Sequence, residues 1–141
     1  MITRGAFFDT NVLLYAMGLR AGRSLDPRSE TAEELVSLGG LISVQVLNEF
    51  VDVASRKMKR NWETISQYLE VIESLCGKAL PLTAEIHGMA VGLSRRHGYR
   101  IYDSLILAAA MQAGCTTLYS EDMQDRQTIG KLTIVNPFIA R

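Results

Sequence analysis

The hydrophobic positions of this chain fall into short apolar runs separated by longer stretches with helical spacing. Apolar runs at residues 6–8, 41–44, 116–119 and 132–135 are typical of strands, and residues 79–82 resemble an edge strand because they contain a proline. Between these runs, apolar residues recur every three or four positions, which predicts helices at residues 12–16, 27–38, 45–57, 61–75, 83–97 and 103–113. Strands alternating with helices predict an α/β fold, a three-layer sandwich in which helices cover both faces of a short, mostly parallel central sheet.

Composition is consistent with a single domain over residues 1–141, because 48% of the residues are hydrophobic and 21% are charged. Lys and Arg total 15, as do Asp and Glu, which excludes a polycation that coats nucleic acid. Cys76 and Cys115 lie in apolar stretches, as core cysteines of a reducing compartment do. The longest apolar run, residues 105–111, is far shorter than the roughly 20 residues of a membrane helix, so we expect a cytoplasmic protein.

Acidic residues stand where this type of fold binds ligands, beyond the carboxyl ends of the strands. Asp9 directly follows the first predicted strand, and Asp122 shortly follows the strand at residues 116–119. Asp103 begins the most apolar helix, where free amides favour a charged carboxylate, and Glu49 lies off the apolar stripe of its own helix. Each acid has a simpler explanation as a helix N-cap, a solvated helix residue or a loop residue. The joint pattern is more specific than any one of its members.

Four segments carry a family resemblance, namely residues 7–16, 46–50, 102–110 and 118–123. In order and spacing they resemble the successive motifs of PIN-domain nucleases, and they are most similar to the VapC-like toxins of toxin–antitoxin pairs. The resemblance implies a metal-dependent endoribonuclease, a cognate antitoxin and a homodimer. It also implies an acidic cluster and its polar support, which would be Asp9, Glu49, Asp103 and Asp122, with Thr10 or Asn11 and Ser120 beside them.

The fourth acidic position is the least defined, because Glu121, Asp122 and Asp125 compete for it, and we choose Asp122. A cluster of carboxylates without histidine or thiolate favours Mg²⁺ or Mn²⁺. Such an ion relieves the repulsion between the carboxylates, activates a water and stabilises charge on the scissile phosphate. The sequence leaves open whether one ion or two are bound. Attack by water predicts products with 5'-phosphate and 3'-hydroxyl ends.

Basic residues next to the motif segments are the expected phosphate contacts of an RNA substrate. They are Arg56, Lys57, Lys59, Arg60, Arg95, Arg96 and Arg100. Each group is equally explained by cations that favour the ends of helices. The RNA target is not encoded in these features, because recognition of single strands depends on loop shape and pocket detail.

Two other functions compete with the nuclease. A phosphatase of the haloacid dehalogenase type also begins with an apolar strand that ends in aspartate, but it requires a second aspartate where this chain has Asn11. The other alternative is a catalytically silent PIN-like module that binds RNA or a protein. The presence of all four acids argues against that module.

Overall fold

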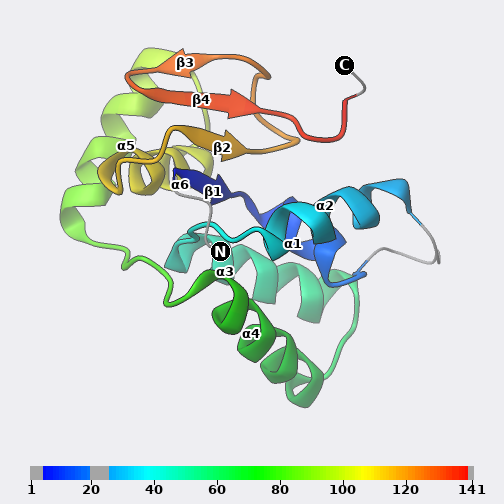
Figure 1. The fold of residues 1–141 in the computed structure, drawn as a ribbon. Helices are drawn as coiled ribbons and strands as arrows, with labels where there is room; N and C mark the ends of the chain where they lie inside the picture. The colour runs from blue at the N-terminus through cyan, green and yellow to red at the C-terminus, as the bar shows by residue number, and fades with distance from the viewer. Residues whose placement is uncertain (1–4, 20–25, 140–141) are drawn as a thin grey trace.

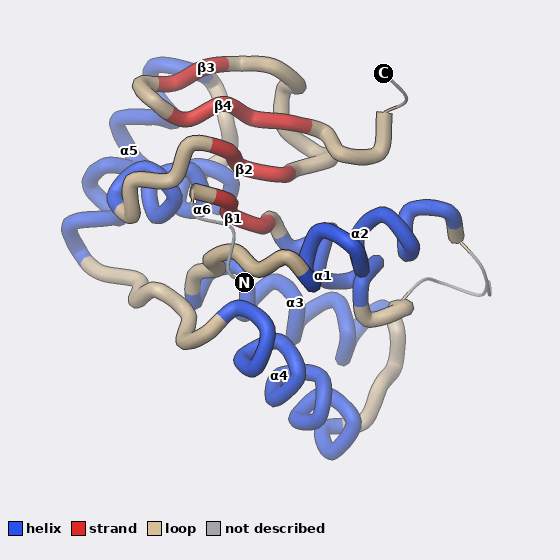
Figure 2. Tube along the Cα trace, viewed as in Figure 1, coloured by secondary structure: helices blue, strands red, loops and turns tan. Residues whose placement is uncertain are grey.

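A computed structural model describes residues 5–19 and 26–139 of the chain (Figure 1). Its elements, in chain order, are β1 (Ala6–Phe8), α1 (Thr10–Ala16), α2 (Pro27–Ser37), α3 (Val44–Asp52), the π-helical turn η1 (Val53–Lys57), α4 (Trp62–Cys76), α5 (Ala84–His97), α6 (Ile101–Gln112), β2 (Thr117–Tyr119), β3 (Thr128–Ile129) and β4 (Leu132–Val135). The strands form a small central sheet between two groups of helices, as Figure 2 shows. The expected three-layer α/β architecture is confirmed.

The central sheet has the strand order β1-β2-β4-β3. β1 pairs with β2 and β2 pairs with β4 in parallel, whereas β3 pairs with β4 in antiparallel orientation. The register places Phe8 opposite Tyr119 at the last residues of β1 and β2. The carboxyl ends of these two strands therefore meet at one edge of the sheet, and they point the same way in Figure 1.

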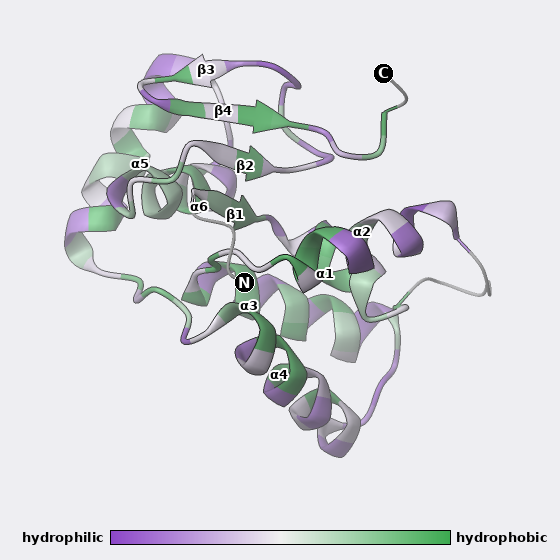
Figure 3. Ribbon diagram, in the orientation of Figure 1, coloured by the Kyte–Doolittle hydropathy of each residue, from purple (hydrophilic) through white to green (hydrophobic). Residues whose placement is uncertain are grey.

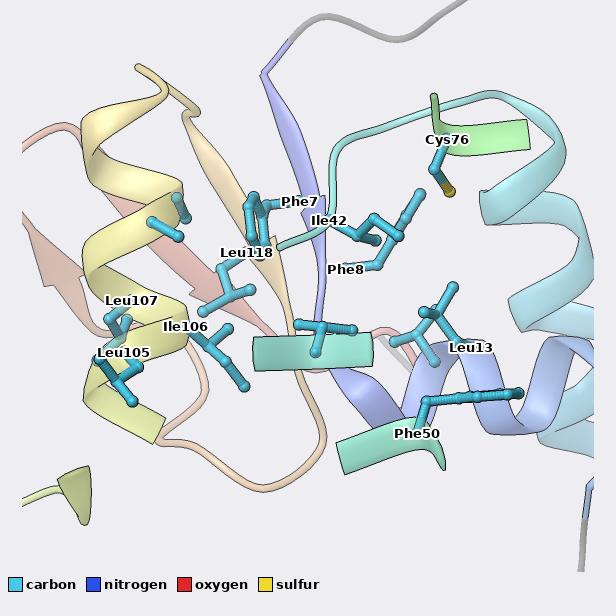
Figure 4. Close-up of a cluster of buried hydrophobic side chains, with 14 of the residues drawn as sticks. Phe7, Phe8, Leu13, Ile42, Phe50, Cys76, Leu105, Ile106, Leu107 and Leu118 are labelled. Atoms are coloured by element: carbon cyan, nitrogen blue, oxygen red, sulfur yellow. The ribbon is translucent and has the colours of Figure 1, made fainter. Parts of the chain in front are cut away.

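The hydrophobic core lies on both faces of the sheet because successive strand residues point to opposite sides. Figure 4 shows Phe7 on the side of α6 and Phe8 on the opposite side, with Ile42 and Leu13. All residues of α6 from 104 to 110 are buried, which explains why that helix is apolar almost all round. Figure 3 shows the contrast with α2 and α4, which carry hydrophilic residues on their outer sides.

The start of α6 differs from the prediction. Arg100 occupies the N-cap position, Ile101 is the first helical residue, and Asp103 lies within the first turn rather than at the start. Asp103 is therefore not the N-cap of this helix. A carboxylate in the first turn still benefits from the free amides and the positive end of the helix dipole.

Two predicted strands shrink to isolated bridges. Residues 41–44 take part in two isolated parallel bridges, one from Leu41 to Phe7 and one from Ser43 to Leu80, and the second is the only bridge of the stretch 79–82 among the described residues. Ser43 caps α3 by accepting a hydrogen bond from the amide of Val46, so the chain turns helical before a strand can extend. The two-residue strand β3 was not predicted, because two residues carry too little alternation to be recognised.

Within the described ranges, none of the helices is both long enough and apolar enough to cross a membrane. Cys76 and Cys115 are buried free thiols, as their apolar surroundings predict. Trp62, the first residue of α4, is 66% exposed and lies outside the core.

Candidate functional site

Asp9 lies at the carboxyl end of β1, and its backbone amide donates to the carbonyl of Tyr119 across the sheet at 3.0 Å. One carboxylate oxygen, Oδ1, accepts a hydrogen bond from the amide of Thr10 at 2.7 Å and so caps α1. The other, Oδ2, accepts from the hydroxyl of Ser120 at 2.7 Å. The N-cap role that the sequence offered as a simple explanation is therefore real, and it leaves the second oxygen on the side of the β2 end.

The protonation of Asp9 is strongly shifted. Burial, with smaller contributions from the negative charges of Glu49 and Asp122, raises the pKa of its carboxyl from 3.8 to about 7, although the hydrogen bonds from Ser120 and Thr10 act in the opposite direction. A carboxylate is costly to keep charged without solvent or a positive partner. Asp9 is thus poised to lose its proton when a cation approaches.

Glu49 reaches the same region from α3, which packs against α1 and α6. Its Oε1 accepts a hydrogen bond from the hydroxyl of Thr10 at 3.3 Å, and its Oε2 accepts one from Nε2 of Gln45 at 3.0 Å. Glu49 is half-buried rather than a fully solvated helix residue. Gln45 was missed by the sequence analysis, although its spacing of four residues from Glu49 on one helix face was a usable signal.

Asp122 lies in the loop after β2, where Nδ2 of Asn11 donates to its Oδ2 at 2.8 Å. Partial burial and the charges of Glu121 and Asp103 raise its pKa, while the charge of Arg100 lowers it. Arg100 also forms an ion pair with Asp103 at 3.7 Å. Asp122 is therefore coupled to Asp103, just as Asp9 is coupled to Glu49 and Asp122.

The other two acids of this loop have separate partners. Glu121 accepts a hydrogen bond from the hydroxyl of Tyr15 at 2.7 Å and forms an ion pair with Arg28 at 2.9 Å. Asp125 accepts from the backbone amide of Asn136 at 2.7 Å, at the end of β4. Because these contacts hold Glu121 and Asp125 in structural roles, the geometry favours Asp122 as the fourth acid.

Ser120 connects the two ends of the site. Its buried hydroxyl donates to Asp9 and accepts from the amides of Asp122 at 3.2 Å and Met123 at 3.3 Å. The loop that carries Asp122 is therefore fixed to the carboxylate of Asp9. All three residues expected as polar support, Thr10, Asn11 and Ser120, contact one of the four acids.

The four acids thus form one electrostatically connected cluster built from β1, α3, α6 and the loop after β2. Among residues 5–19 and 26–139, no three side chains of His, Cys, Asp or Glu are already arranged closely enough to hold a metal ion. The donor set is all oxygen, which suits a hard divalent cation. The side chains would have to move toward one another before three of them share an ion.

The seven basic residues divide into groups. Lys57 and Arg100 line a groove of about 510 Å³ together with Glu49. Arg95 and Arg96 line another cavity on α5, and Arg56 forms an exposed ion pair with Asp52 at 3.6 Å. Lys59 and Arg60 are exposed in the loop before α4. The structure therefore brings two of the seven to the groove that contains a cluster acid.

Comparison with known proteins identifies the family to which this fold belongs. The family model for the PIN domain matches residues 6–128. No curated protein matches the sequence.

Similar solved structures cover nearly the whole chain. A chain of a toxin–antitoxin complex from Klebsiella pneumoniae has a TM-score of 0.68 and 20% identity, and the match covers 94% of this chain and 98% of the other. VapC20 of Mycobacterium tuberculosis, described as a toxin that cleaves the sarcin–ricin loop, has a TM-score of 0.63 and 22% identity over 83% and 89% of the two chains. A chain of VapBC2 from Rickettsia felis, bound to a fragment of promoter DNA, has a TM-score of 0.60 and 21% identity over 95% and 97%. At these identities the likeness establishes a shared fold.

Proposed function

The chain belongs to the PIN domain family, and we propose that it is an endoribonuclease that depends on Mg²⁺ or Mn²⁺ and acts as the toxin of a toxin–antitoxin pair. The observation that carries the proposal is the connected cluster of Asp9, Glu49, Asp103 and Asp122, in which burial and neighbouring charge raise the pKa of Asp9 to about 7. Such a cluster is unfavourable by itself and becomes favourable when a cation compensates it.

The chain supplies an oriented set of oxygen donors. Ser120 and the amide of Thr10 fix the two oxygens of Asp9, and Asn11 holds an oxygen of Asp122. Glu49 is held by Gln45 and by the Thr10 hydroxyl. These contacts orient donors from separate elements. When bound, the ion would supply an activated water and neutralise charge on the scissile phosphate.

The partners follow from the same proposal. The similar structures from Klebsiella pneumoniae and Rickettsia felis are described as a toxin–antitoxin complex and as VapBC2, which supports an antitoxin as the protein partner. VapC20 is described as a toxin that cleaves the sarcin–ricin loop, which supports RNA as the substrate. The homodimer and the cytoplasmic location stay predictions from the sequence.

One observation favours a second function. No three acids of the described residues are already in metal-binding positions, as expected if the domain binds RNA or a protein without cutting it. The two functions differ in one measurable property, which is metal-dependent cleavage.

The test is incubation of purified protein and of its Asp9→Asn and Asp103→Asn variants with total cellular RNA in Mg²⁺, Mn²⁺ or EDTA, followed by mapping of the fragment ends. We expect cleavage by the wild type with either metal, none in EDTA, and 5'-phosphate and 3'-hydroxyl ends. Asp122→Asn should also abolish cleavage, whereas Asp125→Asn, if folded, should retain it. Binding of RNA without cleavage in any metal would support the silent module instead.

A further inference from the structure

Tyr102 is an exposed aromatic side chain beside the acidic cluster. It is the second residue of α6 and immediately precedes Asp103. The residue is 54% exposed, although a tyrosine ring is mostly apolar. Within the described part of the chain, its hydroxyl has no hydrogen-bond partner and its ring stacks on no other aromatic ring.

The surroundings of Tyr102 are a groove rather than an open surface. Tyr102 lines the cavity of about 510 Å³ whose other residues include Glu49, Asn48 and two cations, Lys57 and Arg100. Lys57 ends η1 and Arg100 precedes α6, so the cations come from two separate elements. Glu49 also belongs to the acidic cluster, so the groove and the candidate site share this residue.

Some charged side chains of this groove form ion pairs, whereas Lys57 forms none among the described residues. The carboxylate of Asp52 is paired with Arg56, and Arg100 reaches Asp103 at 3.7 Å with a side chain that is 73% exposed. Lys57 is exposed and has no ion pair among the residues that the structure describes. Exposed cations at the mouth of an acidic site suit a ligand that brings its own negative charges.

We propose that Tyr102 is a stacking platform for one unpaired base of an RNA substrate, with Lys57 and Arg100 contacting the flanking phosphates. An exposed aromatic face between cations is the combination that binds single-stranded nucleic acid with little sequence preference. An A-form duplex keeps its bases stacked inside and cannot offer one to the ring. The groove therefore selects single strands or loops and places the backbone next to the acids.

This inference rests on the proposed RNA substrate but can be tested without cleavage. The experiment measures binding of a fluorescent, mixed-sequence single-stranded RNA to the Asp9→Asn protein in EDTA. The same RNA is also presented as a blunt duplex and as a strand with one internal abasic position. In this background we compare Tyr102→Ala, Tyr102→Phe and Tyr102→Trp. Trp62→Ala, which removes another exposed aromatic side chain outside the groove, is the matched control.

We expect Tyr102→Ala to weaken binding of the single strand about 5- to 150-fold, the range for loss of one stacked base. Tyr102→Phe and Tyr102→Trp should retain binding, because both keep an aromatic face. The salt dependence of binding should be unchanged in Tyr102→Ala and reduced in Lys57→Gln, since only the lysine contacts phosphate. Trp62→Ala should bind like the parent, and the duplex should show no effect of Tyr102.

Several results would overturn the proposal. These are equal binding by Tyr102→Ala and its parent, an equal loss on the duplex, or an equal loss in Trp62→Ala. Thermal unfolding of each variant separates a lost contact from a misfolded protein, and Tyr102→Phe tests the ring with the smallest change. If Tyr102→Ala instead lowers affinity only for a protein partner, the groove is a protein interface and the RNA proposal is wrong.

The result of this binding experiment can be distinguished from the result of the cleavage test for the proposed nuclease. A wild type that cuts no RNA in any metal, combined with binding that needs the Tyr102 ring, removes the enzyme and keeps the stacking site. If the wild type cuts RNA but binding does not depend on Tyr102, the enzyme is retained and the stacking site is rejected.

Discussion

Asp9 is the N-cap of α1 and also a buried carboxyl whose pKa is raised. Its neighbours stabilise the ionised form only partly, because hydrogen bonds from Ser120 and Thr10 are outweighed by burial and by the charges of Glu49 and Asp122. A folded-state pKa of about 7, against 3.8 for an ordinary aspartate, means that the folded protein holds a proton that the unfolded chain releases. Without a metal, the free energy of unfolding therefore falls as pH rises from about 4 to about 7.

The Asp9→Asn variant removes this dependence. In EDTA at pH 8 we expect this variant to be more stable than the wild type by about 2 kcal/mol. The variant avoids the cost of ionising a buried carboxyl, but part of this gain is offset because the amide forms a weaker hydrogen bond. At pH 4 the difference should vanish or change sign, because Asp9 is then protonated in the folded state and its carboxyl is near its midpoint of titration in the unfolded chain. Urea unfolding of both proteins at the two pH values measures this difference in stability. A wild type whose stability is flat between pH 5 and pH 8 would contradict the raised pKa.

Ser120 should matter for stability and for the acidity of Asp9 together. Ser120→Ala removes a donor to the buried carboxylate and an acceptor for two loop amides, so we expect a loss of about 2 kcal/mol in the free energy of unfolding. The pKa of Asp9 should also rise further, because a hydrogen bond that lowers it is gone.

Urea unfolding as a function of pH measures both effects of Ser120→Ala, the loss of stability and the change in the pKa of Asp9. Ser74→Ala is the control, since that hydroxyl donates to the carbonyl of Val71 at an exposed position of α4. Its stability should stay within about 0.5 kcal/mol of the wild type. Equal effects of the two substitutions would show that the Ser120 contacts contribute nothing special.

At the scale of elements, the sequence identified the helices well because each has its own local signals. Asp26, Asn61 and Thr83 cap α2, α4 and α5 as their side-chain chemistry predicts. The strands were less predictable, since their existence depends on distant partners. The segment at 41–44 has strand-like residues but is limited by Gly40 on one side and by the cap of α3 on the other, which no local pattern reveals.

Gly40 shows how tightly that segment packs against the sheet. A Cβ at this position would lie 2.6 Å from Cε2 and 2.8 Å from Cζ of Phe8, whose ring is fully buried, and 3.2 Å from the carbonyl oxygen of Ala6. We therefore expect Gly40→Ala to lower the free energy of unfolding by about 1–3 kcal/mol through overpacking.

A matched substitution on α5 should act in the opposite direction. Gly88 lies within this helix and a Cβ there would meet nothing within 4 Å, so Gly88→Ala should raise the stability by about 0.5–1 kcal/mol. Thermal or urea unfolding of both variants checks the pair. A stabilising Gly40→Ala would mean that residues 40–42 can move away from Phe8 without loss.

At the scale of the whole molecule, the acidic cluster depends on the parallel pairing of β1 and β2, which are more than 100 residues apart along the chain. The sequence placed Asp9 and Asp122 at strand ends and so brought them to one edge of the sheet. It named Ser120 as polar support but not its hydrogen bond to Asp9, which depends on how the β2 end packs against Asp9, and it missed the Gln45 hydrogen bond to Glu49 on α3. Nor did it distinguish Asp122 from Glu121, whose partner Arg28 comes from α2.

A metal that binds this cluster should stabilise the entire fold, because it ties together elements from both ends of the chain. We expect Mn²⁺ or Mg²⁺ to raise the melting temperature of the wild type by several degrees, corresponding to about 2.7 kcal/mol when the metal is at 100 times its Kd. The shift should be larger at pH 8 than at pH 5, because Asp9 must lose its proton to bind a cation. EDTA should reverse it.

The pattern of variants decides where the ion binds. Asp9→Asn and Asp103→Asn should lose most of the metal-induced shift, whereas Asp125→Asn, whose carboxylate accepts from the amide of Asn136, should keep it even if its starting melting temperature is lower. Differential scanning calorimetry with and without metal supplies both numbers for each variant. A shift that survives in Asp9→Asn and Asp103→Asn would mean that the cation binds elsewhere. The electrostatic coupling between the four carboxylates would then serve some purpose other than holding a metal.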